Sequence, residues 1–140
     1  MKSILLALVL YSISCPTGFG QTFPASTPAP VKAWYTAWLN NNWDLLTKNL
    51  ADGFTFSSPV DDHIQLMTVK ERCWPNAGNI RRVEIEKLII DGTNVIVIST
   101  GWNKSGKSFR NCDYFKVSKG KILTYECFFG PGINFPNSGK

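Results

Sequence analysis

Residues 106–130 read Gly-Lys-Ser-Phe-Arg-Asn-Cys-Asp-Tyr-Phe-Lys-Val-Ser-Lys-Gly-Lys-Ile-Leu-Thr-Tyr-Glu-Cys-Phe-Phe-Gly, and they carry the strongest fold signal in the chain. Two runs rich in aromatic and other strand-forming residues, Ser108–Val117 and Ile122–Phe129, flank a short link that contains Gly120. This pattern is typical of a β-hairpin. The functional question is which face of the hairpin carries Asp113, because a buried carboxyl group is often a functional group.

The link between the two runs determines the strand register. Ser118-Lys119-Gly120-Lys121 suits a type I turn followed by a glycine in the left-handed region, and this loop pairs Val117 with Lys121. One face is then mainly apolar and the other mixed and charged, as in a half-buried antiparallel sheet. The apolar face would carry Phe109, Asn111, Asp113, Phe115, Leu123, Tyr125, Cys127 and Phe129. The other would carry Arg110, Cys112, Tyr114, Lys116, Ile122, Thr124, Glu126 and Phe128.

A register shifted by one residue is the alternative. It would set Asp113 opposite Glu126 and Cys112 opposite Cys127, which would allow a carboxylate pair and a cross-strand disulfide. It also divides the polar groups evenly between the two faces and so specifies a core poorly. We favour the first register, in which the two cysteines point to opposite faces.

In the favoured register Asp113 is a carboxyl group inside an aromatic cavity, near Asn111 and Tyr125. Loss of solvent would raise its pKa, so it could donate a hydrogen bond in its neutral form or act as a general acid or base. The alternative is a purely structural aspartate that is bound to a helix amide or an arginine.

Upstream of the hairpin, the periodicity predicts helices followed by strands. Val31, Trp34, Tyr35 and Trp38 lie on one helical stripe, and residues 43–50 form a second helix that ends at Gly53. The other predicted elements are a short strand over 54–57, a helix from Asp61 or Asp62 to Cys73, and strands over 82–90, 95–102, 108–117 and 122–129. This order indicates an α+β fold, with N-terminal helices on one face of a curved antiparallel sheet and an apolar pocket between them.

The N-terminal residues indicate export. Lys2, an apolar run from Ile4 to Ile13 and small residues before Gln21 resemble a secretory signal peptide cleaved near Gly20. A run of ~10 residues is too short to span a membrane, which takes about 20. Lipid attachment at Cys15 is the less favoured alternative, because the residues before it do not fit a lipoprotein signal. We therefore expect a secreted or periplasmic protein with a Pro-rich flexible lead-in (21–30), one domain (31–132) and a C-terminal tail (133–140).

Composition excludes several kinds of site. Cleavage removes Lys2 and lowers the formal net charge from +5 to +4, and the basic residues are scattered, which argues against nucleic-acid binding. His63 is the only histidine and the cysteine spacing fits no zinc pattern, so we expect no metal and no cofactor. The three cysteines left after cleavage, Cys73, Cys112 and Cys127, leave the disulfide state open.

Several strings along the chain carry a family resemblance. They are Trp43-Asp44-Leu45-Leu46, Leu50-Ala51-Asp52-Gly53-Phe54, Ser57-Ser58-Pro59-Val60-Asp61-Asp62-His63, Arg72-Cys73-Trp74-Pro75, Phe109-Arg110-Asn111-Cys112-Asp113 and Glu126-Cys127-Phe128-Phe129-Gly130. Their order and spacing resemble the SnoaL-like and ketosteroid-isomerase-like branch of the nuclear transport factor 2-like superfamily, over roughly residues 31–130. Members include isomerases, cyclases, dehydratases and binding proteins, so fold alone does not determine function.

The resemblance implies half of an isomerase site. Asp113 aligns with that family's oxyanion-binding aspartate, whereas its general base aligns with Ser58 and its oxyanion tyrosine aligns with Trp34, beside Tyr35. A displaced base could come from Asp61, Asp62 and His63, which otherwise belong to a helix cap. The pocket is expected to be lined by Trp34, Tyr35, Trp38, Phe56, Trp74, Asn111, Tyr125, Cys127 and Phe129.

Two functions remain open at this stage. The first is binding of a small, mostly apolar molecule, with isomerase-, cyclase- or dehydratase-type proton transfer. The second is a non-catalytic ligand-binding or interaction module. In either case a homodimer is expected through the outer hairpin face at Tyr114, Ile122 and Phe128, as in many relatives.

Overall fold

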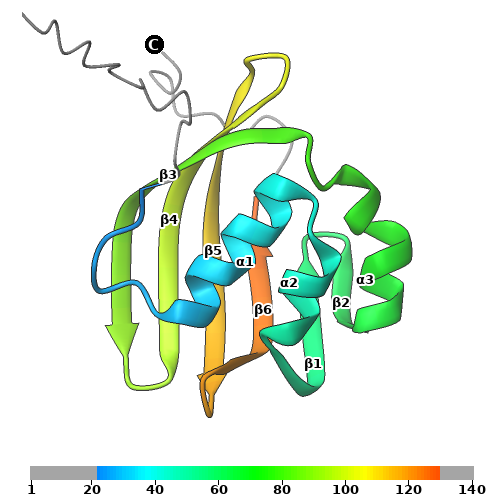
Figure 1. Cartoon of the computed structure of the whole chain (residues 1–140), viewed down its shortest axis with the longest axis vertical. Coiled ribbons are helices and arrows are strands. Elements are labelled where there is room, and N and C mark those ends of the chain that lie inside the picture. The colour runs from blue at the N-terminus through cyan, green and yellow to red at the C-terminus, as the bar shows by residue number, and fades with distance from the viewer. Residues whose placement is uncertain (1–21, 130–140) are drawn as a thin grey trace, which may run out of the picture.

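The computed structural model describes residues 22–129, so the expected signal peptide and the C-terminal tail lie outside the described residues. A six-stranded sheet has the strand order β2-β1-β6-β5-β4-β3, with every pair antiparallel except β1 and β6. The strands are β1 (Leu50–Ser58), β2 (Asp61–Gln65), β3 (Ile80–Asp91), β4 (Asn94–Asn103), β5 (Ser108–Ser118) and β6 (Lys121–Phe128). The helices are α1 (Ala29–Asn40), α2 (Trp43–Lys48), α3 (Leu66–Arg72) and the 3₁₀ turn η1 (Trp74–Asn76). The predicted α+β cone is confirmed (Figure 1).

Helix α1 crosses one face of the curved sheet and buries the predicted stripe (Figure 1). It begins at Ala29, before the expected boundary at Val31, because Pro30 suits the first turn of a helix. Residues before it also contact the domain. Thr27 is buried, and the ring of Phe23 lies 6.2 Å from that of Tyr35. Helix α2 starts at an Asn42 cap whose side chain accepts a hydrogen bond from the Leu45 amide.

The segment after α2 differs from the prediction in two places. Gly53 does not end a helix, because the chain has already entered β1 at Leu50, and Gly53 lies at a break in its pairing with a positive φ of 72°. The predicted helix cap at Asp61 or Asp62 is also wrong. Both residues belong to β2, an edge strand paired with β1, and α3 begins only at Leu66.

The hairpin has the predicted faces around Asp113 but a different register. Lys119 and Gly120 both have positive φ and form a two-residue turn, so Ser118 pairs with Lys121 and Val117 with Ile122. The pairing then shifts at Leu123, and beyond it Asp113 lies opposite Cys127.

This one-residue bulge explains which of the predicted side-chain directions on β6 are correct. It restores the inward position of Asp113, Tyr125 and Cys127 but turns Ile122 into the core, where it is fully buried. Ile122 was expected on the outer face, and that assignment is wrong. Cys112 and Cys127 lie on opposite faces as expected, and Cys73, Cys112 and Cys127 are free thiols.

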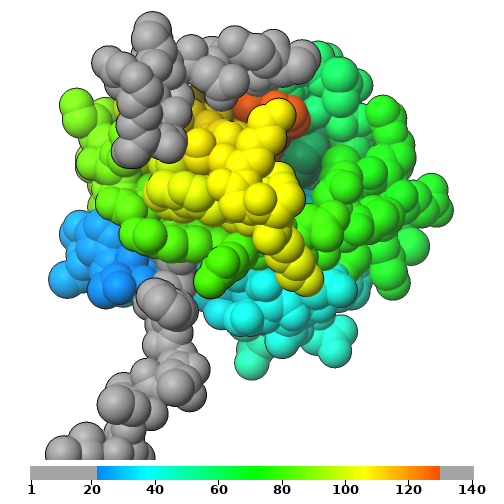
Figure 2. All heavy atoms as spheres, turned by 90° about the horizontal axis from the view of Figure 1, so that it is seen from above, coloured from blue at the N-terminus to red at the C-terminus, as the bar shows by residue number. Residues whose placement is uncertain are grey.

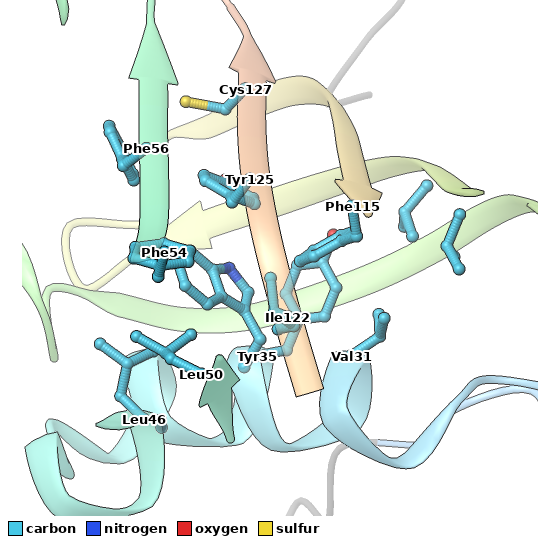
Figure 3. Close-up of a cluster of buried hydrophobic side chains, with 14 of the residues drawn as sticks. Val31, Tyr35, Leu46, Leu50, Phe54, Phe56, Phe115, Ile122, Tyr125 and Cys127 are labelled. Atoms are coloured by element: carbon cyan, nitrogen blue, oxygen red, sulfur yellow. The ribbon is translucent and has the colours of Figure 1, made fainter. Parts of the chain in front are cut away.

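The core lies between α1, α2 and the concave face of the sheet (Figure 3). Its largest fully buried side chains include Phe115, Leu46 and Ile122. Trp34 is its aromatic centre, because its ring lies 4.2 Å from the Tyr125 ring and 5.9 Å from the Phe115 ring. In residues 22–129 no helix is long and apolar enough to cross a membrane.

Candidate functional site

A pocket of about 320 Å³ opens between α1, α3 and the strands β1, β4, β5 and β6. From above, a hollow is visible between the end of β6, the yellow residues near the β4–β5 turn and the green segment that contains α3 (Figure 2). Its wall is mostly apolar and aromatic, as in sites that bind small organic molecules. Of the residues expected to line it, Trp34, Tyr35, Trp38, Phe56, Asn111, Tyr125, Cys127 and Phe129 do so. Trp74 does not, because it packs behind the wall between Trp38 and Trp43.

Asp113 lies behind the pocket wall, where only 1% of it is exposed. The hydroxyl of Tyr35 donates to its Oδ2 at 2.6 Å, and the hydroxyl of Tyr125 donates to its Oδ1 at 2.9 Å. Both tyrosine rings line the pocket, whereas Asp113 does not. The aspartate was expected to face the cavity directly, so this is a correction: the tyrosines stand between the carboxyl group and any ligand.

Three elements hold this Tyr35–Asp113–Tyr125 triad. Tyr35 comes from the buried stripe of α1, Asp113 from the inner face of β5 and Tyr125 from the inner face of β6. Tyr125 and Cys127 point to the same side as Phe56 of the adjacent strand β1, which pairs with Tyr125 (Figure 3). Each hydroxyl therefore reaches the carboxyl group from packed secondary structure, which fixes its position.

Burial controls the proton affinity of the triad. Loss of solvent raises the pKa of Asp113 to about 6, against the opposing effect of the two tyrosine hydrogen bonds. Burial and the nearby Asp113 charge raise the pKa values of Tyr35 and Tyr125 well above 10. Asp113 is thus the group of the triad that changes charge near neutral pH.

Two further residues extend the triad along the sheet. Ser99 of β4 is buried on the inner face and lines the pocket, and its hydroxyl opposes the increase in the pKa of Tyr35. Cys127 lies beyond Tyr125, and burial raises the pKa of its thiol to about 12, so it is a poor nucleophile. Ser99 was not predicted as a site residue. The signal was the alternation Val95, Val97, Ser99 on β4, which puts a hydroxyl among apolar inward positions.

A second cluster of polar side chains lies at the pocket wall, on β1, β2 and α3. The Asp61 carboxylate is almost buried; Arg72 contacts its Oδ1 at 2.7 Å, and the Ser58 hydroxyl donates to its Oδ2 at 2.9 Å. The Cys73 thiol lies 3.9 Å from the same Oδ2, and all four residues line the pocket. The expected displaced carboxylate therefore lies beside Ser58, but it is paired with arginine.

The other two members of the expected displaced base lie elsewhere. Asp62 and His63 pair with each other at 2.5 Å between Oδ1 and Nδ1. Their side chains are 90% and 65% exposed, and neither lines the pocket. Asp61 and Asp62 are neighbours on the edge strand β2, so Asp61 faces inward and Asp62 outward. His63 has a positive φ of 48°, which breaks the alternation and leaves its side chain exposed.

The wall on β4 and β5 depends on one glycine. Gly101 pairs with Phe109, and the Phe109 ring covers the space that a side chain at position 101 would occupy. A Cβ there would lie 2.7 Å from Cε2 of the ring, which is closer than van der Waals contact allows. Gly101 thereby lets Phe109 form part of the pocket wall.

The comparisons with known proteins agree with this architecture. The family model described as a SnoaL-like domain matches residues 31–125. A comparison with curated proteins gave no match.

Solved structures of similar fold come from several bacteria. An NTF2-like protein of unknown function from Cytophaga hutchinsonii is 21% identical with a TM-score of 0.57, covering 73% of this chain and 88% of its own. An LEH-like epoxide hydrolase of M. tuberculosis is 21% identical with a TM-score of 0.60, covering 74% and 81%. A protein with a ketosteroid isomerase-like fold from Catenulispora acidiphila, in complex with trimethylamine, is 20% identical with a TM-score of 0.58, covering 75% and 88%.

Sequence identities this low support a shared fold only. The family model matches most of the domain and therefore supports membership of the family. Together with the cone, the pocket and the inward-facing aspartate, they confirm the resemblance found in the sequence. The chain belongs to the SnoaL-like domain family, and it shares its fold with NTF2-like and ketosteroid isomerase-like proteins of known structure.

Proposed function

We propose that the domain binds a small, mostly apolar organic molecule in the pocket and transfers a proton through the Tyr35–Asp113–Tyr125 triad. The observation that carries this proposal is a buried carboxyl group whose two oxygens are both bound by tyrosines that line the pocket. A ligand proton passes to a tyrosine oxygen while the hydroxyl proton of that tyrosine passes to Asp113. The pKa of about 6 at Asp113 leaves the carboxylate free to accept it at neutral pH.

A simple cyclic ketone tests the proton transfer without knowledge of the natural substrate. We would follow exchange of the α-protons of 2-tetralone in D₂O by NMR, with and without protein at about pH 7.5. Asp113→Asn removes the proton acceptor and keeps the size of the side chain, so exchange above the buffer rate should fall at least ~10-fold. The matched control is Tyr114→Phe, which removes a tyrosine hydroxyl that binds Asn94 outside the pocket.

Two results would favour the alternative, a non-catalytic binding module. One is equal exchange in the wild type and Asp113→Asn, and the other is a ligand that stays bound unchanged during native mass spectrometry of the purified protein. Exchange that Asp113→Asn abolishes and Tyr114→Phe leaves unchanged would support catalysis.

We also propose that the outer face of the sheet forms a homodimer. Its support is an apolar row across three strands, in which Ile98 pairs with Cys112 and Cys112 with Phe128, which is 58% exposed. Phe128→Glu should convert a dimer to a monomer in sedimentation equilibrium. Met67→Glu, at a similarly exposed position on α3, should leave the dimer intact.

Export is a further proposal. It is supported by the basic start, the short apolar run and the small residues before Gln21. Intact-mass measurement of protein recovered outside the cytoplasm should give a chain that begins near Gln21. A full-length chain retained in the cytoplasm would contradict it.

A further inference from the structure

The hydrogen-bonding capacity of the triad determines the kind of ligand that it can hold. A tyrosine hydroxyl has one proton to donate, and an ionised carboxylate has none. Tyr35 and Tyr125 each donate that proton to Asp113. While the carboxylate is ionised, neither tyrosine has a proton left for a ligand, and only the oxygen lone pairs remain.

We infer that the Tyr125 oxygen accepts a hydrogen bond from the ligand, so that the pocket binds an apolar molecule bearing a hydroxyl group more tightly than one whose oxygen can only accept. A ketone such as 2-tetralone is then a weaker ligand, which the pocket holds through its rings. This inference rests on the proposed ligand-binding function and names its substrate class. Tyr125 is the better acceptor of the two, because the Ser99 hydroxyl already opposes the increase in the pKa of Tyr35 and so competes for the lone pairs of its oxygen.

Two residues that line the pocket also carry a polar atom without a hydrogen-bond partner. Among the described residues, Oδ1 of Asn111 and Nε1 of Trp38 are buried without a hydrogen-bond partner. One is an acceptor and the other a donor, and a buried polar atom left unpaired is unfavourable by about 1–3 kcal/mol. A hydroxyl is the smallest group that both donates and accepts.

Protonation of Asp113 reverses this selectivity. The neutral acid donates its proton to one tyrosine oxygen, and the hydroxyl of that tyrosine is released toward the pocket as a donor. The groups that face Asp113 are Tyr35 from α1, Tyr125 and Cys127 from β6, and Cys112 on its own strand. Within residues 22–129, no ion pair involves Asp113, and the change follows its own pKa of about 6.

Three probes with one ring system test the inference: naphthalene, 2-naphthol and 2-methoxynaphthalene. The methoxy compound keeps the oxygen acceptor and lacks the donor, and 2-naphthol stays un-ionised at both pH values used. Binding is measured by quenching of tryptophan fluorescence, since Trp34 and Trp38 line the pocket. At about pH 7.5 we expect 2-naphthol to bind roughly 5-fold more tightly than 2-methoxynaphthalene, which corresponds to one net hydrogen bond.

At about pH 5 the difference in affinity between 2-naphthol and 2-methoxynaphthalene should become smaller or change sign. The tyrosine hydroxyl that protonation of Asp113 releases can then donate to the methoxy oxygen. Asp113→Asn should show this weak preference at both pH values. Its amide group donates to one tyrosine and accepts from the other, which preserves the fold and mimics the protonated acid. Tyr125→Phe should lose the preference for 2-naphthol and still bind naphthalene, whereas Tyr114→Phe should match the wild type.

The possible failures are distinct. If no probe binds, the proposed function and this inference both fall. If the probes bind but 2-methoxynaphthalene binds as tightly as 2-naphthol at pH 7.5, only the inference falls. The same holds if the preference does not change with pH or in Asp113→Asn.

Discussion

The Tyr35 hydroxyl donates a 2.6 Å hydrogen bond to Oδ2 of Asp113, which joins the first helix to the fifth strand across 78 positions of the chain. The bond has two effects. It positions the aspartate behind the pocket wall, and it opposes the increase in its pKa that burial causes. The same contact therefore affects both the stability and the chemistry of the domain.

Removing either hydroxyl of the triad should destabilise the domain. Tyr35→Phe or Tyr125→Phe leaves one Asp113 oxygen buried without a partner, and we expect the free energy of unfolding to fall by about 1–3 kcal/mol. Urea denaturation at pH 7.5 measures this. Tyr114→Phe removes a hydroxyl that binds Asn94 at a half-buried position, and it should lower the free energy of unfolding by less. Equal losses in all three variants would contradict the special role of the triad.

The stability of the wild type relative to Asp113→Asn should depend on pH. The Asp113 pKa is about 6 in the folded protein, compared with 3.8 for an ordinary aspartate, so between these values the folded state binds more protons than the unfolded state. Stability relative to the variant should therefore fall as pH rises from about 4 to 6 and stay constant above 7. The total change is about 3 kcal/mol at most, since one pKa unit corresponds to about 1.4 kcal/mol.

Urea denaturation of both proteins at several pH values measures that difference, and the other titrating groups cancel because both proteins contain them. A difference that rises with pH over this range would mean that the Asp113 pKa is depressed by folding, in contradiction to its burial without an opposite charge.

The Asp61–Arg72 pair should contribute more to stability than an exposed pair. Arg72→Gln removes the positive charge beside a carboxylate that is only 5% exposed. Because the arginine itself is half exposed, we expect a loss of about 1–2 kcal/mol in urea denaturation. Glu84→Gln disrupts the Arg82–Glu84 pair, which is exposed on both sides, and should change stability by less than about 0.5 kcal/mol. Comparable losses for the two pairs would contradict the burial argument.

Gly101→Ala should reduce ligand binding as well as stability. The added Cβ displaces the Phe109 ring, which lines the pocket, and overpacking of this kind is unfavourable by about 1–3 kcal/mol. Naphthalene binding and urea denaturation measure the two effects. The double variant Gly101→Ala/Phe109→Leu frees the space and should recover much of the stability. If the second substitution recovers none of it, the ring is not the obstacle.

Much of the fold was predictable because apolar periodicity specified it. The stripe that contains Trp34 and Tyr35 formed α1, and the aromatic alternation around Asp113 placed that residue inward. Strand β2 was missed because Asp61-Asp62-His63 has the polar composition of a helix cap, and its edge position requires little apolar character. The exact hairpin register was missed because the two-residue turn and the bulge at Leu123 together retain the predicted faces beyond Leu123.

The site was predictable to the level of residue types but not of contacts. The sequence indicated a buried aspartate and an aromatic pocket. It did not indicate that Tyr35 would bind Asp113, since that contact depends on how α1 lies across the sheet. Nor did it separate Asp61 from Asp62 and His63, because the direction of each side chain depends on the unpredicted strand.

The parallel pairing of β1 with β6 makes the pocket depend on the last of the described strands. Thr55 pairs with Thr124, so β1 has no partner on that side until nearly all of the described chain has been made. A nascent chain that ends before β6 lacks Tyr125 and Cys127 and leaves Asp113 with a single tyrosine. Such long-range pairing closes late and slowly. Strand β6, the last of the described strands in chain order, thus completes both the sheet and the proton-binding group.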